Sequence, residues 1–415
     1  MASIAPNSRP QQRKKSSRLC RVKKISRLFL TGAPDASSVR SMTPISATDA
    51  ASGDWPMIEA QLPPRFREMA EEHKVIRKTP PQLRAKITDA AVVLRLILHH
   101  VAAGVSLKVT CATAAAVNLV NISSVALHLR MRTSGSWLAA LVTEMIAMPR
   151  AFEAARWAGY EIMVVDATAL TRPGAEGTTA RIHYVLRLTD LALAQHRVTD
   201  EHVGETFRWF SIEEDQLWMG DRAYANPPAI AFVKAGGGDV LVRYNFGSLP
   251  LYDARRRRLD VRGMVAKLGS PGRVQEWPVS VLPESGEVIR GRLCAVRLPP
   301  KKAQEARARL RREQGASLTQ ESIATAEFVV VFTTVPKKRL SAVRVMELYS
   351  LRWQVELHIK RDKSIRAVDE LQNVRPDTIH SWICAKLLAQ QIAQRIATPA
   401  VAFPPSAVGQ AALAG

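Results

Sequence analysis

The sequence lacks three features that would place it in well-defined protein classes: paired cysteines, histidines spaced as metal ligands, and a long apolar run. Its four cysteines are scattered over 415 residues, and none of its nine histidines repeats at the spacing His-x-x-x-His. The most apolar window, residues 90–105, is interrupted by Arg95 and two histidines and is too short to cross a bilayer. We therefore expect no disulfide framework, no zinc site and no membrane segment, and a reducing cytoplasm as the compartment.

Acidic residues are scarce relative to basic ones. The chain has 37 Asp and Glu against 59 Lys and Arg, which gives a formal net charge of +22. A chain this basic is expected to bind a polyanion, with nucleic acid favoured over a membrane surface. A ribosomal or RNA-packaging protein would also be basic, but such proteins are usually shorter and less apolar.

Residues 1–55 are rich in Ser, Pro, Ala and Arg, and this composition predicts a disordered basic arm. Nine of the first 30 residues are Lys or Arg, and the first acidic residue is Asp35. Two interpretations fit about equally well. The arm follows DNA phosphates, or it is upstream sequence translated ahead of a true start at Met42 or Met57.

Residues 60–155 predict a helical DNA-binding domain. Within it, residues 106–116 and 123–132 predict two helices joined by a short turn, with small alanine side chains where the helices would approach each other. The second helix would suit the major groove of DNA, and it offers three side chains for contact: His128, Arg130 and Arg132. The turn has no glycine, and two packed helices of a bundle explain the pattern equally well.

Two short apolar runs predict strands that are buried on both faces, and each ends in a carboxylate. They are residues 161–166, ending in Asp166, and residues 217–221, ending in Asp221. Another strand is expected at 327–333. The segment between, residues 249–325, has turn signals, strand-like pieces and a strongly basic helix, and it predicts a β-rich insertion. The chain is then divided into a catalytic core at 156–248 and 326–396, the insertion at 249–325, and a tail at 397–415.

One helix is predicted over residues 347–365, because the stretch has no Gly or Pro and Ser341 precedes it as a plausible N-cap. At about 100° per residue, four side chains fall within an arc of roughly 60°: Tyr349, Arg352, Glu356 and Lys363. A carboxylate flanked by two cations and a phenol suits a metal ion held beside phosphates. A solvated charged face is the alternative, and on spacing alone it is the more common explanation.

Three carboxylates have comparable placement: Asp166, Asp221 and Glu356. Strand ends are where sites are built in open sheets. Three converging carboxylates repel one another and need divalent ions, and two Mg²⁺ would suit phosphoryl transfer on DNA. An aspartate at a strand end can instead cap a helix, which is the better explanation for either one taken alone.

At this level of detail the chain resembles the DDE transposases of insertion-sequence family four. The family's signature is Tyr, two residues, Arg, three residues, Glu, six residues and Lys, which the four side chains of the predicted helix match in order and spacing. The surroundings of the two aspartates match as well: Val165-Asp166-Ala167-Thr168 and Gly220-Asp221-Arg222-Ala223-Tyr224. The resemblance covers residues 85–396, and a β-rich insertion before the glutamate is typical of it.

The resemblance implies an α/β fold: an RNase H-like catalytic core with a β-rich insertion, preceded by an all-α DNA-binding domain. It implies cut-and-paste transposition, with Asp166, Asp221 and Glu356 as ligands of two Mg²⁺, for which Mn²⁺ can substitute. Five side chains would bind phosphates near the cleaved end: Tyr349, Arg352, Lys363, Lys360 and Arg222.

The implied partners are DNA, as terminal inverted repeats and target, and a second copy of the chain in a dimer on DNA. The implied location is the bacterial cytoplasm, at the nucleoid. Two rival functions stay open. One is a DDE-type nuclease that cuts DNA without joining it. The other is an inactive, transposase-derived DNA-binding protein, against which the intact set of three acids argues.

Overall fold

The computed structural model divides the chain into two compact units. Unit 1 comprises residues 1–149, 171–177 and 361–415, and unit 2 comprises residues 150–170 and 178–360. The structure describes these residues: 55–76, 87–148, 156–172, 174, 177–284, 286–315, 319–357, 360, 371 and 375–397. The predicted basic arm up to residue 54, the tail from residue 398 and Lys363 lie outside the described residues.

The described part of unit 1 is helical. Its helices are α3 (Trp55–Glu59), α4 (Phe66–Glu72), α5 (Ala90–Ala103), α6 (Leu107–Ala116), α7 (Ser124–Thr133), α8 (Gly135–Ala147) and α15 (Pro376–Ala397). The helices predicted at 106–116 and 123–132 correspond to α6 and α7, which Ser106 and Ser123 cap by accepting backbone N–H bonds. Among the described helices, none is both long and apolar enough to cross a membrane.

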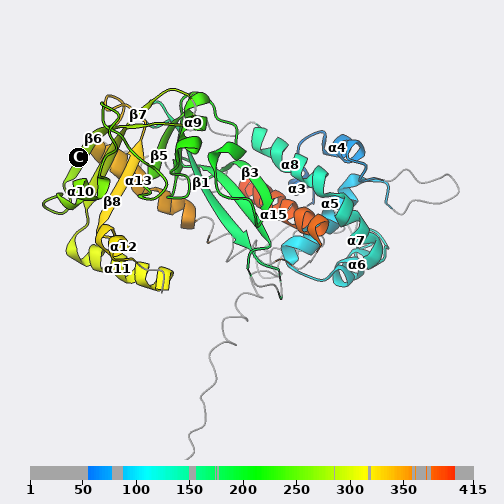
Figure 1. Cartoon of the computed structure of the whole chain (residues 1–415). Helices are drawn as coiled ribbons and strands as arrows, with labels where there is room; N and C mark the ends of the chain where they lie inside the picture. Colours follow the sequence, from blue (N-terminus) through cyan, green and yellow to red (C-terminus); the bar gives the residue numbers. More distant parts are fainter. Residues whose placement is uncertain are drawn as a thin grey trace, which may run out of the picture. The chain divides into compact units, whose positions relative to one another are not determined.

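Unit 2 is built on a single sheet of eight strands (Figure 1). The strands are β1 (Glu161–Leu170), β2 (Ala180–Arg187), β3 (Leu193–Asp200), β4 (Gln216–Gly220), β5 (Asp239–Arg243), β6 (Val274–Val281), β7 (Ile289–Arg297) and β8 (Phe328–Thr333). Their order across the sheet is β3-β2-β1-β4-β5-β8-β7-β6.

The first five strands have the arrangement expected of an RNase H-like core. β1, β2 and β3 pair as an antiparallel meander, whereas β4 and β5 run parallel to β1. Parallel neighbours need crossover connections, and α9 (Pro227–Ala235) supplies the one between β4 and β5. The predicted α/β fold class is confirmed.

β1 is longer than the sequence predicts. The expected strand ends at Asp166, but β1 continues to Leu170 because β2 keeps pairing with it as far as Leu170 opposite Ala180. The parallel pairing with β4 stops at Val164, opposite Met219. Asp166 therefore lies just beyond the parallel pairing, although not at the end of its own strand.

The segment predicted as a β-rich insertion holds more helix than strand. It contains α10 (Val261–Ala266), α11 (Pro300–Gln314) and α12 (Gln320–Thr325), besides β6 and β7. The two strands do not form a sheet of their own, because β7 pairs with β8 and so extends the main sheet. The expected strands and the expected basic helix are present, but the segment holds more helix than the description "β-rich" implies.

Helices cover both faces of the sheet. Val242, Leu293 and Phe332 point into one apolar core, to which α9 and α10 contribute. Side chains alternate along a strand, so the intervening buried residues Leu241 and Val331 point to the other face. There α13 (Ala342–Ser350) packs on β5, β6 and β7.

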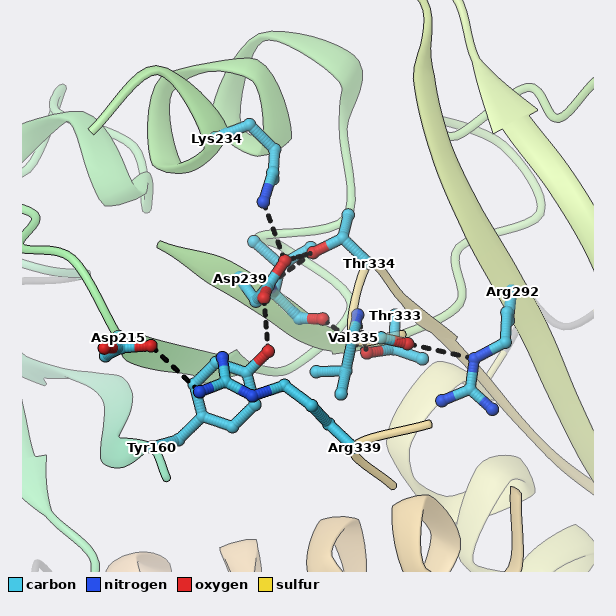
Figure 2. A network of polar contacts seen from close by, with 10 residues as sticks. Tyr160, Asp215, Lys234, Asp239, Arg292, Thr333, Thr334, Val335 and Arg339 are labelled. Carbon is cyan, nitrogen blue, oxygen red and sulfur yellow. Dashed lines mark hydrogen bonds and ion pairs between the residues drawn. The ribbon is translucent and has the colours of Figure 1, made fainter. Parts of the chain in front are cut away.

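A buried polar network ties the amino ends of β1 and β5 to the segment that leads into α13 (Figure 2). Asp239, the first residue of β5, accepts hydrogen bonds from Tyr160 Oη at 2.5 Å, Lys234 Nζ at 2.7 Å and Thr334 Oγ1 at 2.7 Å. Arg339 lies over the Tyr160 ring at 4.0 Å. These bonds fix the strands at the edge opposite to Asp166 and Asp221.

Candidate active site

Asp166 supplies a partly buried carboxylate beside the central strands. Its Oδ1 accepts a hydrogen bond from the Ala167 N–H at 2.9 Å, so it does not cap a helix. Burial raises the pKa of Asp166. The Ala167 N–H and Arg352 oppose the rise, the carboxylates of Asp221 and Glu356 add to it, and the resulting pKa is about 6. The side chain therefore lies in electrostatic contact with both other predicted acids.

Asp221 follows β4 directly and begins a tight turn. Its Oδ1 accepts from the Ala223 N–H at 2.8 Å, while the next helix, α9, is capped by Asn226 instead. A Cβ at position 220 would lie 2.9 Å from the ring of Tyr224, so Gly220 lets that ring fold back under the turn. Neither Asp166 nor Asp221 caps a helix, so helix capping does not explain why these two aspartates follow apolar runs.

Glu356 lies in a helical segment, residues 352–357, that follows α13 after a turn at Leu351. The prediction of one unbroken helix is therefore wrong at Leu351, where the backbone forms shorter i to i+3 hydrogen bonds. The predicted N-cap is confirmed, since Ser341 Oγ accepts from the Arg344 N–H. Glu356 forms an ion pair with Arg352, and Lys360 Nζ approaches it at 4.0 Å.

Tyr349 of α13 and Glu356 of the following segment both interact electrostatically with Arg352. The Arg352 guanidinium is 6.0 Å from the centre of the Tyr349 ring. Burial raises the pKa of the Tyr349 hydroxyl, although Arg352 and Arg243 oppose the rise. Arg222 is exposed, next to Asp221. The structure thus brings Tyr349, Arg352, Glu356 and the two aspartates into one electrostatic neighbourhood.

The donor set fits a divalent cation by its chemistry, although the carboxylates are not arranged as ligands. Hard carboxylate oxygens are what Mg²⁺ and Mn²⁺ prefer. The raised pKa of Asp166 comes mainly from burial, with smaller contributions from the carboxylates of Asp221 and Glu356. Among the described residues, however, no three acidic, His or Cys side chains lie close enough to hold a metal ion, and Glu356 instead contacts Arg352.

Two further charged groups belong to this neighbourhood. Burial and the carboxylates of Asp221 and Asp166 raise the pKa of Glu205, which precedes the short 3-10 helix η1 (Phe207–Trp209). Arg243, the last residue of β5, is half-buried and interacts electrostatically with Arg352, and desolvation lowers its pKa to about 10. Like Asp221, Arg243 is a charged residue directly after an apolar run, and this sequence pattern could have identified it as a candidate site residue. Nothing in the sequence around Glu205 marks it.

The buried hydroxyl of Tyr224 faces the same acids. Its Oη has no hydrogen-bond partner in the described part of the chain. Burial raises the pKa of Tyr224 well above its ordinary value, and Glu205, Asp166 and Asp221 add to the rise. A buried phenol surrounded by carboxylates is placed to donate a hydrogen bond once one of them approaches.

The side chains of α7 predicted to read DNA lie in unit 1, where two of them already bond to other residues of the protein. Arg130 Nη1 donates to the Val75 carbonyl at 2.7 Å, and Arg132 Nε lies 2.8 Å from Asp377 of α15. His128 is half-buried. The most exposed large side chains of α7 are apolar, Val125 and Leu129.

Comparison with known proteins gives matches over most of the chain. A family model described as a transposase DDE domain matches residues 157–392. The chain is 31% identical over 334 residues to a putative transposase InsL for insertion sequence element IS186A of Escherichia coli strain K12, covering 79% of this chain and 90% of that protein. It is 31% identical over 335 residues to the transposase for insertion sequence element IS421 of Escherichia coli, with the same coverage. A cryo-EM structure of the piggyBac transposase synaptic complex with hairpin DNA aligns with a TM-score of 0.37, 8% identity, and coverage of 92% of this chain and 77% of that chain.

Proposed function

The chain belongs to the DDE transposase family and acts on DNA as a transposase, and we propose that Asp166, Asp221 and Glu356 are its three catalytic acids. One observation supports this assignment above the others. Asp166 and Asp221 come from neighbouring parallel strands, Glu356 comes from a helical segment far along the chain, and the charge of each of the other two acts on Asp166.

The chemistry of the family depends on divalent metal ions, and we propose two Mg²⁺, with Mn²⁺ as a substitute. Bound by the three acids, these ions would activate the attacking oxygen and stabilise the leaving oxygen of a phosphoryl transfer. The side chains keep roles of their own. Arg352 would grip a phosphate of the cleaved end in place of Glu356, and Tyr349 would hold the Arg352 guanidinium in position.

The finer assignments are proposals of the same kind. Lys360, Arg222 and Lys363 would bind phosphates near the cleaved end. We also propose, from the spacing of Tyr349 to Lys363, that the chain is a member of insertion-sequence family four. We propose DNA ends and target DNA as substrates, a homodimer on DNA, and a place at the bacterial nucleoid. His128, Arg130 and Arg132 stay a proposal for DNA binding, one that requires Arg130 and Arg132 to leave their partners in unit 1.

The test is cleavage of a plasmid that carries the two DNA ends flanking the gene. The full-length protein is expected to cut the ends and join them to target DNA in the presence of Mg²⁺. Glu356→Gln should reduce cleavage by a factor of about 10³ or more, whereas Glu347→Gln, which alters an exposed ion pair with Arg344, should keep it. Cleavage that survives Glu356→Gln overturns the assignment, and cutting without joined products indicates a nuclease.

A further inference from the structure

α11 lies at the same edge of the sheet as the catalytic acids. It follows β7 and precedes α12 and β8 (Figure 1). The last residue of β7, Arg297, pairs with the first residue of β8, Phe328. β8 runs antiparallel to β5, with Val331 opposite Arg243 at the carboxyl end of β5. Because β4 and β5 are parallel, this is the edge at which Asp221 follows β4.

A chain of contacts connects α11 with the active site. Arg307 of α11 forms an ion pair with Glu327 at 2.5 Å, and Arg297 pairs with the same carboxylate at 3.3 Å. The next residue, Phe328, accepts a hydrogen bond through its carbonyl from Arg243 Nη2 at 3.1 Å. Arg243 in turn interacts electrostatically with Tyr349, Arg222 and Arg352. Through Arg307, α11 is thus connected to residues that lie beside the three acids.

The outward face of α11 is strongly cationic. At about 100° per residue, four cations fall within an arc of roughly 100°: Lys301, Lys302, Arg309 and Arg312. All four are exposed, and Glu305 is the single acid among them. The opposite face contains Ala303, Arg307 and Leu310, and of these only Ala303 is fully buried.

This composition is not what core packing requires. A helix that packs on a core shows an apolar stripe, and α11 has one buried alanine and one half-buried leucine in its place. A merely solvated face usually mixes both signs, because an excess of one sign causes repulsion between neighbouring turns. A polyanion relieves that repulsion. The 15 residues span about 22 Å, the length of about six base-pair steps along one strand of a duplex.

We propose that the cationic face of α11 is a DNA-backbone contact, which holds the duplex that enters the active site. The proposal rests on the transposase function and adds a surface to it. Lys301, Lys302 and Arg312 bind phosphates without reading the sequence, and the ion pair between Arg307 and Glu327 fixes the helix beside the acids.

The test compares two triple variants that lose the same charge. The first is Lys301→Gln, Lys302→Gln and Arg312→Gln on α11. The control is Arg255→Gln, Arg256→Gln and Arg258→Gln, in an exposed loop whose Tyr252 pairs with Ser280 at the opposite edge of the sheet, near the start of β7. The affinity of each full-length protein for a fluorescein-labelled 30-base-pair duplex (about three helical turns) is measured over a range of salt concentrations.

Each lost phosphate contact lowers the slope of log K against log salt by about 0.9. We expect the slope to fall by about 2 to 3 in the α11 variant and by less than about 0.5 in the control. An unchanged slope in the α11 variant overturns the proposal. So does an equal fall in both variants, which would indicate attraction by net charge alone. Failure of the catalytic assignment gives a separate result, because that assignment is tested by end cleavage with Glu356→Gln and not by the salt slope.

Discussion

Arg352 forms an ion pair with Glu356 one helical turn further along the chain, and so the glutamate that we propose as a catalytic acid is held by a guanidinium. The same guanidinium lowers the pKa of Asp166. In the absence of metal and DNA, Arg352 thus supplies positive charge to two of the three acids. On the proposed assignment, metal and Arg352 would compete for Glu356, and phosphate would compete with Glu356 for Arg352.

We predict that Arg352→Gln raises the affinity for Mn²⁺ in the absence of DNA, by about three- to tenfold, because a competing cation is removed. The same change should lower end cleavage, since a phosphate contact is lost. Titration calorimetry measures the affinity. Arg344→Gln is the control. It removes an exposed ion pair with Glu347 and should change neither the affinity for Mn²⁺ nor the end cleavage. A lower affinity for Mn²⁺ in Arg352→Gln contradicts the competition.

Asp166 should make stability depend on pH. Its folded pKa of about 6 lies above the usual 3.8, so the folded state holds the proton more tightly. Its contribution is therefore most favourable below about pH 4 and is lost as the pH rises through 6. Without divalent ions, Asp166→Asn should be more stable than the wild type by up to about 2 kcal/mol at pH 8, and equal to it near pH 4. Urea unfolding at both pH values checks this; a difference that does not depend on pH would contradict it.

Glu205 should destabilise the metal-free protein. Its carboxylate faces those of Asp221 and Asp166, and Arg181 is the cation that opposes them. Glu205→Gln is therefore expected to raise the thermal midpoint at pH 8 by about 1–2 °C and to raise the Mg²⁺ concentration needed for cleavage several-fold. Glu201→Gln, at an exposed position nearby, is the matched control. If both variants change the thermal midpoint and the Mg²⁺ requirement equally, repulsion between Glu205 and the acids is not the cause.

Asp239 should stabilise the fold with the opposite dependence on pH. Burial alone would raise its pKa, but hydrogen bonds from Lys234, Thr334 and Tyr160 outweigh burial and hold the pKa below its usual value. The stabilisation is thus present above about pH 4 and is lost as the pH falls further. Asp239→Asn should cost about 2–4 kcal/mol at pH 7, and less at pH 3, as measured by urea unfolding. Tyr160→Phe, which removes one donor, should cost about 1.5–3 kcal/mol. An Asp239→Asn protein as stable as the wild type at pH 7 would contradict the role of the network.

Local features could be predicted from the sequence because neighbouring residues decide them. Ser341 caps its helix as expected. Ser106 and Ser123 cap α6 and α7 in the same way, and Gly104 ends α5 with a positive φ. The apolar runs before Asp166 and Asp221 form strands. The helix break at Leu351 was missed, since a change from i+4 to i+3 bonding leaves no mark in composition.

Long-range pairing decided the rest. β6 and β7 join the main sheet because β7 pairs with the free edge of β8. No local sequence pattern indicates that β7 and β8 are partners. Arg130 and Arg132 meet Val75 and Asp377 only after the helices of unit 1 have packed.

The sequence by itself determined the chemistry of the protein: an excess of positive charge, and a Tyr349–Arg352–Glu356 spacing that one helical face can hold. Only the tertiary structure decided which other groups share that site. Glu205 and Arg243 are brought to it by strand pairing, across separations of more than 100 residues from Glu356. Electrostatic forces act through space, whereas sequence patterns extend over a turn or a strand, so these neighbours become visible only in the fold.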